Sequence, residues 1–415
     1  MDETHRAAES VFREESGRII ASLIRIAGSF DRAEEAMQEA FASALASWPQ
    51  RGLPQNPAAW IMTAAHRKLI DSARREQTVR NKQEALRYET EVSVAAPEEI
   101  EQTTMCLPDD RLRLIFTCCH PALNVEAQVA LTLRTLGGLT TPEIAKAFLI
   151  PEPTLAQRLV RAKRKIQEAG IPYEVPPQER LPERVAAVQV VIYLIFNEGY
   201  AASTGNALVR HDLCGEAIRL GRLLCELLPR DAESLGLLAL MLLQHSRRDA
   251  RVIDGELVTL EDQDRSRWDR DAIAEGLLLV ERALTLGPPG QYQLQAAIAA
   301  LHAEPASSAN TDWLQIAALY GKLLELNPSP VIALNHAVAV AMGGSLEDGL
   351  RRIDELGRAR TLHQYYLFHA ARADLLRRLH RNDSAAAAYR EAARLATNPI
   401  EVSFLQRRLH ELRAS

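Results

Sequence analysis

The chain has 415 residues, of which 47% are hydrophobic and 25% charged, and its formal net charge is −5. This length suits two or three domains with a sizeable core. Aromatic residues are few while Ala, Leu and Arg dominate, which favours helix over sheet. No segment offers about 18 uninterrupted apolar residues, which excludes a membrane span. The charged N-terminus lacks the apolar core of a secretory signal, so we expect a cytoplasmic protein.

Five cysteines in a chain of this length do not form a disulfide framework. Cys118-Cys119-His120 suggests a metal or redox site, but adjacent cysteines rarely ligate one ion together. No CxxC or HxxxH pattern accompanies them. We therefore interpret the two cysteines as core residues and expect neither a metal nor a cofactor.

The first predicted domain, residues 8–76, is helical, with helices expected over 10–27, 31–48 and 57–75. Asp31 is a plausible cap of the second helix, because Glu34 follows three residues later as in a capping box. Prolines and a glycine predict a loop over 48–57. The third helix carries Trp60 among basic side chains, a combination that suits single-stranded nucleic acid, although Trp60 is equally well explained as a core aromatic.

Residues 77–110 are predicted to form an acidic linker. Between Glu84 and Asp110 there are eight acids and a single base, Arg87. Such a charge run is typical of an extended segment with short helical pieces, and a solvated tether between domains explains it without further function.

Residues 111–170 are predicted to form a compact helical domain that ends in a helix-turn-helix. Thr141-Pro142-Glu143 opens a short helix, prolines break it over 149–153, and a second helix is expected from Thr154. One face of this second helix is apolar and the other basic, as a reader of the DNA major groove requires. The alternative is a solvated basic helix on the surface of a bundle.

In the second helix we assign two roles by position. Side chains near the N-terminus of a helix in the major groove face base edges, so the candidate readers are Thr154, Gln157, Arg158 and Arg161. The candidate phosphate contacts, which position the domain without reading sequence, are Lys163, Arg164 and Lys165.

Residues 183–415 are helical in pattern throughout, with a weak repeat of about 34 residues that matches a TPR-like solenoid. In the clearest unit, residues 366–397, Ala373 and Ala385 are small enough for two helices to approach closely, and Tyr389 is the bulky wedge. The turn is expected at Asn382-Asp383. Solenoids present concave surfaces to peptides or other domains, and the scattered histidines form no catalytic arrangement, so we do not expect an enzyme.

Three segments, in order, resemble an extracytoplasmic-function (ECF) RNA polymerase sigma factor. Residues 31–41 are similar to the region-two segment that docks on the polymerase β′ subunit. Residues 59–61 with 66–75 are similar to regions 2.3 and 2.4, which open and read the −10 promoter element. Residues 149–165 resemble the region-four helix that reads the −35 element. Residues 113–123, 193–203 and 212–224 resemble the subgroup with a C-terminal TPR-like extension.

The resemblance implies an all-α fold, with two small helical sigma domains joined by an acidic linker and followed by a TPR-like α-solenoid that regulates activity. It implies three kinds of partner: core polymerase through its β′ and β subunits, promoter DNA, and a protein or peptide on the solenoid. The implied core-polymerase contacts are Asp31, Glu34, Glu35, Gln38, Glu39 and Phe41. The implied −10 contacts are Asn56, Trp60, His66, Arg67, Lys68, Arg74 and Arg75.

Other classes of protein stay open. A helix-turn-helix regulator with a TPR-like sensor domain, which never replaces sigma, would explain the basic helix but not the two upstream segments. A TPR adaptor would make that helix incidental surface. A metal enzyme built around Cys118-Cys119-His120 would need a bound ion.

Overall fold

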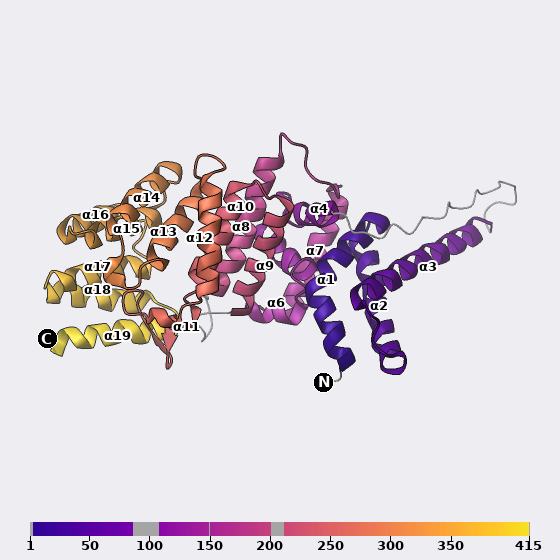
Figure 1. Cartoon of the computed structure of the whole chain (residues 1–415), viewed down its shortest axis with the longest axis horizontal. Helices are drawn as coiled ribbons and strands as arrows, with labels where there is room; N and C mark the ends of the chain where they lie inside the picture. The colour runs from indigo at the N-terminus through magenta and orange to yellow at the C-terminus, as the bar shows by residue number, and fades with distance from the viewer. Residues whose placement is uncertain (1–2, 86–107, 149, 201–210, 415) are drawn as a thin grey trace. The chain divides into compact units, whose positions relative to one another are not determined.

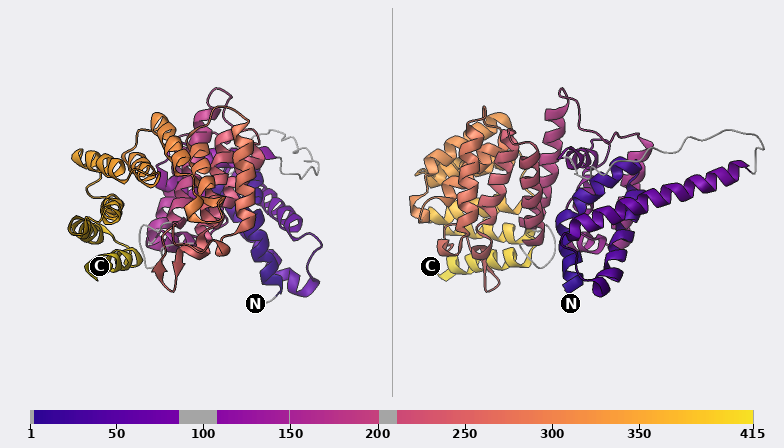
Figure 2. Two further views of the ribbon diagram at one scale, coloured as in Figure 1. Left: turned by 60° about the vertical axis from the view of Figure 1, so that its left-hand side comes forward. Right: turned by 45° about the vertical axis from the view of Figure 1, so that its right-hand side comes forward.

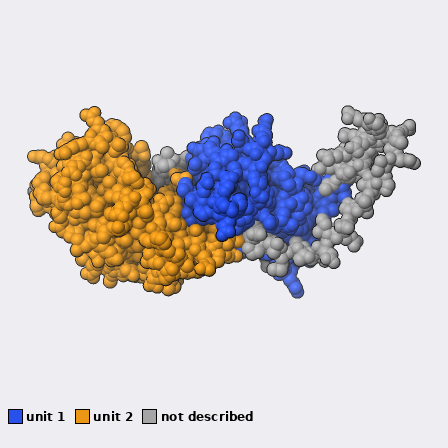
Figure 3. Space-filling view, turned by 90° about the horizontal axis from the view of Figure 1, so that it is seen from above, with its two compact units in different colours: residues 1–191 blue, residues 192–415 orange. Residues whose placement is uncertain are grey.

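The computed structural model describes residues 3–85, 108–148, 150–200 and 211–414 (Figure 1). The chain divides into two compact units, Met1–Val191 and Ile192–Ser415, which are coloured separately in Figure 3. Helix α8 (Leu181–Tyr200) contains the division. Nearly all described elements are helices, so the all-α prediction is confirmed.

The first unit begins with three helices that pack on one another: α1 (Glu3–Ala27), α2 (Phe30–Arg51) and α3 (Pro57–Ala85). The predicted cap of α2 at Asp31 is wrong. Ser29 holds that position, because its backbone is extended and its hydroxyl accepts from the Arg32 amide. The predicted loop over 48–57 is shorter, since α2 continues through the buried Trp48 and through Pro49. The chain leaves the helix at Gly52, whose φ of 82° favours glycine.

The first unit continues with α4 (Pro108–Cys118), α5 (Val125–Thr135), α6 (Thr141–Ala147) and α7 (Glu152–Glu168). Helices α6 and α7 pack on each other as the predicted helix-turn-helix. Helix α6 begins at Thr141 as predicted, and Thr140 precedes it as the cap, with its hydroxyl and amide donating to the Glu143 carboxylate. The predicted start of α7 is wrong. Helix α7 begins at Glu152, two residues early, since Pro153 falls in the first turn, where no amide donor is needed.

The Cys118-Cys119 pair lies in the core of the first unit. Both thiols are fully buried, with Sγ of Cys118 3.2 Å from the Thr135 hydroxyl and Sγ of Cys119 3.5 Å from the Thr132 hydroxyl. Burial raises the pKa of both thiols, that of Cys119 to about 11. Their interpretation as packing residues is confirmed. In the part of the chain that the structure describes, no group of His, Cys, Asp and Glu side chains is arranged to hold a metal ion.

The second unit is a succession of helices in which, apart from the short α11, neighbours along the chain pack on each other (Figure 2). Aspartates at the N-caps of three of them, Asp231, Asp269 and Asp312, accept from backbone amides in the first turn. Its elements are α9 (His211–Leu227), α10 (Ala232–His245), α11 (Arg248–Arg251), β1 (Val252–Ile253), β2 (Glu256–Leu257), η1 (Arg265–Arg267), α12 (Arg270–Leu284), α13 (Gln291–Ala303), η2 (Ser308–Asn310), α14 (Trp313–Leu326), α15 (Pro330–Met342), α16 (Leu346–Arg358), α17 (Tyr366–Arg378), α18 (Asn382–Leu395) and α19 (Pro399–Ala414).

The predicted repeat unit over 366–397 is the pair of helices α17 and α18. Ala373 and Ala385 are completely buried between them and Tyr389 is 2% exposed, as predicted. The turn, however, is at Leu379 and His380, and Asn382 already opens α18. The residue His380 takes the left-handed conformation (φ 56°) that ends α17.

A short antiparallel hairpin, β1 and β2, interrupts the helices, and nothing in the sequence pattern predicted it. Helix α3 runs to Ala85 and α4 starts at Pro108, so helix occupies both ends of the range assigned to the acidic linker. Residues 86–107, which carry most of that prediction, and Leu149 lie outside the described residues. No described helix is both long and apolar enough to traverse a bilayer.

Candidate nucleic-acid interface

The outer face of α7 gathers most of the predicted base readers. At 100° per residue, Thr154, Arg158, Arg161 and Lys165 lie within about 60° of one another, with Gln157 on the flank. All are exposed except Arg158, which is partly exposed. An apolar stripe about 100° further round the helix anchors it in the core through Leu155, Leu159, Ala162 and Ile166, each less than 10% exposed. The helix therefore presents a basic face of known composition to solvent.

Lys163 does not belong to that face. It lies about 180° from Thr154 around α7, and its Nζ is 2.5 Å from Oε2 of Glu34 and 3.5 Å from Oδ1 of Asp31. The Lys163 and Glu34 side chains are only 15% and 16% exposed. Arg164, at the edge of the outer face, pairs with Glu168 one turn on. Lys163 is therefore bound to α2 by ion pairs, whereas its position in the sequence predicted a contact with DNA phosphate.

Helix α2 exposes an acidic stripe. Asp31, Glu35, Gln38 and Glu39 all lie on its solvent side, and Glu34 borders that side next to α7. Oε2 of Glu39 is 3.2 Å from Nζ of Lys68, in an ion pair that is well exposed on both sides.

Phe41 is separate from the stripe. Its ring packs edge-to-face on Phe12 of α1, with centroids 5.4 Å apart. It therefore stabilises the packing of α1 on α2, and only part of its surface faces solvent.

Helix α3 carries a second basic face. Trp60, Arg67 and Arg74 recur at seven-residue intervals on one side, with Arg75 beside them, and the three arginines are exposed. Trp60 is partly exposed and packs edge-to-face on the buried Trp48, with centroids 5.6 Å apart. Sequence reasoning missed this partner because it left Trp48 at the start of a loop. The contact fixes the indole of Trp60 while part of its surface still faces solvent.

Three other residues assigned to the −10 element have partners within the first unit. Nε2 of His66 is 3.3 Å from the Ser22 hydroxyl of α1, and burial, together with Arg25, holds the pKa of His66 below its ordinary value. Lys68 points to Glu39. Asn56 is exposed, and its side-chain oxygen accepts from the Ala59 amide, 3.0 Å away, at the start of α3.

A contact between α1 and α4 was also missed. Asp110 is 1% exposed, and its carboxylate lies 3.0 Å from Nε of Arg25 and 2.8 Å from Nη1 of Arg113. The Tyr173 hydroxyl donates to the Ala21 carbonyl at 2.8 Å. In the sequence Asp110 is recognisable only as an acid of the predicted linker, since no local spacing links it to Arg25. These bonds hold the two helical regions of the first unit together.

A helix-turn-helix with an outward basic helix, beside a three-helix region with one acidic and one basic face, defines a DNA-binding subunit of the transcription machinery. Comparison with known families agrees. Residues 11–79 match Sigma-70 region 2, residues 113–166 match Sigma-70 region 4, and residues 184–284 match a family of unknown function, DUF6596. The chain belongs to the ECF-type RNA polymerase sigma factors, with a DUF6596 segment in its C-terminal extension.

Relatives span both parts of the chain. It is 44% identical over 400 residues to an uncharacterized protein of Rhizobium meliloti (strain 1021), covering 95% of this chain and 93% of that protein. A probable ECF RNA polymerase sigma factor, SigI, of Mycobacterium tuberculosis (strain H37Rv) is 24% identical over 177 residues. That match covers 42% of this chain and 59% of SigI.

Proposed function

We propose that this protein is a sigma factor that directs core RNA polymerase to specific promoters, and that residues 183–415 regulate its activity. The observation that carries the proposal is the pairing of two faces in regions matched to sigma-70: the exposed basic face of α7 and the exposed acidic stripe of α2. A helix-turn-helix regulator needs the first face only.

In this proposal the outer face of α7 enters the major groove of the −35 element. Gln157, Arg158 and Arg161 are long enough to reach base edges, and a bidentate pair contributes about 1–3 kcal/mol of discrimination. To Lys165 and Arg164, further along the helix, we assign contacts with phosphates. Opening Arg164 from Glu168 is cheap, because both side chains are more than half exposed.

The acidic stripe of α2 is the proposed contact with core polymerase, through Asp31, Glu35, Gln38 and Glu39. Glu34 is part of the same predicted set but is bonded to Lys163. A polymerase surface that takes Glu34 must therefore break its ion pair with Lys163 of α7. We infer that engagement of polymerase by α2 and release of Lys163 are coupled.

The proposed −10 surface is the face of α3 with Trp60, Arg67, Arg74 and Arg75. An aromatic platform beside a row of cations suits an unstacked, single-stranded segment. Base stacking on such a platform contributes about 1–3 kcal/mol per base. Asn56, at the mouth of the loop before α3, is the candidate for an extruded base, and its amide nitrogen is the donor it would offer, since its oxygen caps the helix.

Run-off transcription with core polymerase, the full chain and genomic fragments tests the proposal. A Glu35→Lys/Glu39→Lys variant should lose core binding and transcript. Its matched control is Glu281→Lys/Glu325→Lys, which makes the same charge change at two exposed helical acids of the second unit, one of them also paired with a lysine. If wild-type protein and core polymerase never form a stoichiometric complex, the regulator hypothesis replaces this one.

The sign of the proposed regulation is testable in the same assay. A chain truncated at about residue 180 is compared with full-length protein on one promoter. A rise in transcript marks residues 183–415 as inhibitory, a fall marks them as required for activity, and equal transcript contradicts a regulatory role. Core-binding measurements on the truncated chain separate loss of regulation from loss of folding.

A further inference from the structure

One segment of the second unit, residues 259–265, lies across a groove formed by the helices that follow it. It connects β2 to η1 and separates three hollows of about 780, 470 and 500 Å³. The largest shares Asp262, Phe404 and Arg408 with the second and Glu261 and Arg265 with the third. The hollows therefore adjoin one another along this segment, and together they offer more space than a single compact ligand requires.

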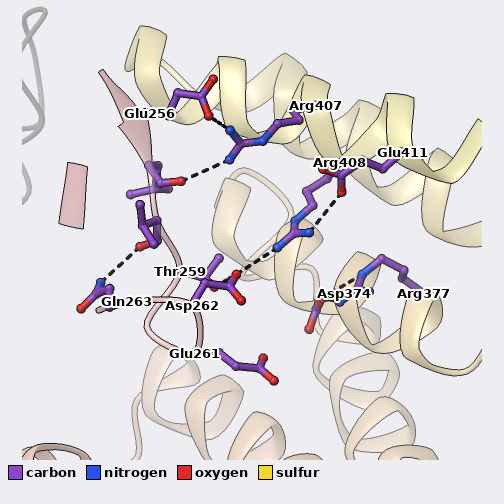
Figure 4. Close-up of polar contacts among 12 residues, drawn as sticks. Glu256, Thr259, Glu261, Asp262, Gln263, Asp374, Arg377, Arg407, Arg408 and Glu411 are labelled. Atoms are coloured by element: carbon purple, nitrogen blue, oxygen red, sulfur yellow. Dashed lines mark hydrogen bonds and ion pairs between the residues drawn. The ribbon is translucent and has the colours of Figure 1, made fainter. Parts of the chain in front are cut away.

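Arginines on α17 and α19 line this groove. Figure 4 shows the ion pairs of the two α19 arginines, Arg408 with Asp262 of the crossing segment and Arg407 with Glu256 of β2. Nη2 of Arg378 is 2.5 Å from Oε2 of Glu261, and Nη2 of Arg408 is 3.5 Å from Oδ2 of Asp262. The acids are 50%, 59% and 61% exposed for Glu261, Asp262 and Glu256, respectively. The segment thus sits on the arginines as an acidic ligand would.

These contacts are exchangeable. Ion pairs as exposed as these contribute about 0–1 kcal/mol each, so carboxylates from another molecule can replace Glu261 and Asp262 at little cost. The arginines keep further partners on their own helices, Asp374 for Arg378 and Glu411 for Arg408, which fix their guanidinium groups in place. Pre-oriented arginine forks suit anionic acceptors that bind in a bidentate manner, such as carboxylates.

The largest hollow adds an apolar floor. Trp313 packs edge-to-face with His302, with ring centroids 5.1 Å apart, and Val338, Met342 and Phe404 complete the lining. Burial, with Arg247 and Arg265 nearby, lowers the pKa of His302 to about 4, so its ring is neutral at pH 7. An apolar side chain is therefore the group that this floor suits.

We propose that the groove binds an acidic peptide segment of a partner protein, whose carboxylates replace Glu261 and Asp262 on Arg378 and Arg408 while an apolar side chain packs on Trp313. The extended row of hollows favours a peptide over a small anion, and the arginines that it lines up favour acidic over basic sequences. The inference deepens the regulatory role proposed for residues 183–415, and it rests on that role for its biological use.

The test measures fluorescence anisotropy of a fluorescein-labelled peptide of glutamate and leucine, titrated with the full chain at low salt. Peptides with glutamine or lysine in place of glutamate are the ligand controls. We expect the Arg378→Gln/Arg408→Gln variant to bind the acidic peptide at least tenfold more weakly. Its matched control, Arg351→Gln/Arg394→Gln, removes two equally paired arginines on α16 and α18 and should bind within twofold of wild type.

A second variant removes the dependence on folding. Glu261→Gln/Asp262→Asn frees the two arginines, so we expect the acidic peptide to bind about three- to tenfold more tightly, a gain that misfolding cannot produce. Binding of the glutamine peptide as tightly as the acidic one overturns the proposal. So does absence of binding to both the wild type and this variant. Neither result bears on the sigma assignment, because the assay contains no polymerase or promoter.

Discussion

The arginines of the two units differ in whether an acidic side chain of the protein binds them. On α7 of the first unit, Arg158 and Arg161 make no ion pair within the described residues. The face of α7 that carries them is exposed to solvent. On α17 of the second unit, Arg377 and Arg378 both bind Asp374, and Arg378 reaches Glu261 as well. The difference lies in the acids nearby, because α7 offers none at helical spacing to Arg158 or Arg161. An arginine kept without an internal partner is available to phosphate or base edges.

The largest effect should come from the unpaired arginines. Replacing both by glutamate, as Arg158→Glu/Arg161→Glu, removes two predicted base contacts and adds repulsion to phosphate, so promoter-dependent transcription should fall by about a hundredfold or more. The comparison variant is Arg351→Glu/Arg394→Glu, at two paired arginines of α16 and α18, which should leave core binding and transcript within about threefold. Equal losses in the two would mean that exposure on α7 carries no special role, and run-off transcript measures both.

Asp110 tests the same comparison through an acid, because this buried carboxylate binds two arginines of the first unit, Arg25 and Arg113. The Asp110→Ala change leaves Arg25 and Arg113 without their buried carboxylate and should lower the free energy of unfolding by about 3 kcal/mol. Asp31→Ala, at a carboxylate 80% exposed, should change it by no more than about 0.5 kcal/mol.

The readout for Asp110 is urea denaturation followed by tryptophan fluorescence. Phenylalanine replaces Trp268 and Trp313 in the background, so that Trp48 and Trp60 report on the first unit alone. A loss no larger than that of Asp31→Ala would show that the buried pair does not hold the two regions together.

In the second unit the burial of His302 predicts a dependence on pH. Its folded pKa of about 4 lies below the ordinary 6.5, so between these values the unfolded chain binds a proton that the folded chain refuses. The free energy of unfolding carries no penalty from His302 above pH 6.5. It falls as the pH drops, by about 1–2 kcal/mol between pH 7 and 5. His302→Phe should remove most of this slope and leave the part due to His336, whose pKa is also lowered by burial, whereas His410→Gln, at an exposed ring, should preserve it. Urea denaturation midpoints at both pH values, read from the fluorescence of Trp268 and Trp313, show which of the two variants keeps the dependence on pH.

Much of the fold was predictable because it follows from local spacing. The apolar stripe of α7, from Leu155 to Ile166, is buried as its period requires, and the small residues Ala373 and Ala385 meet where a helix pair must be close. Helix ends were less accurate, since a proline tolerated in a first turn, such as Pro153, looks like a breaker in sequence.

The parts that sequence missed join residues far apart in the chain. Trp48 supports Trp60, and Asp110 binds Arg25 across 85 positions. The crossing segment over 259–265 has no periodic signal, because its acids bind arginines on helices more than a hundred residues later. Only packing in three dimensions brings such groups together.

Lys163 lies on the recognition helix in sequence, but in the structure it forms an internal ion pair with α2. Its substitution therefore separates two roles, contact with DNA and contact with α2. If its task is the contact with α2, Lys163→Ala should leave promoter affinity within about twofold, whereas Arg161→Ala should weaken it by tenfold or more. A double-mutant cycle with Glu34→Gln should show a coupling of about 1 kcal/mol in unfolding, because the pair is mostly buried. Since Glu34 also lies in the predicted polymerase-binding set, Lys163→Ala should increase the rate of core binding modestly. Zero coupling together with a tenfold loss of promoter affinity would mean that Lys163 contacts phosphate and does not hold α7 to α2. Electrophoretic mobility shifts measure the promoter affinity, and denaturation midpoints give the coupling.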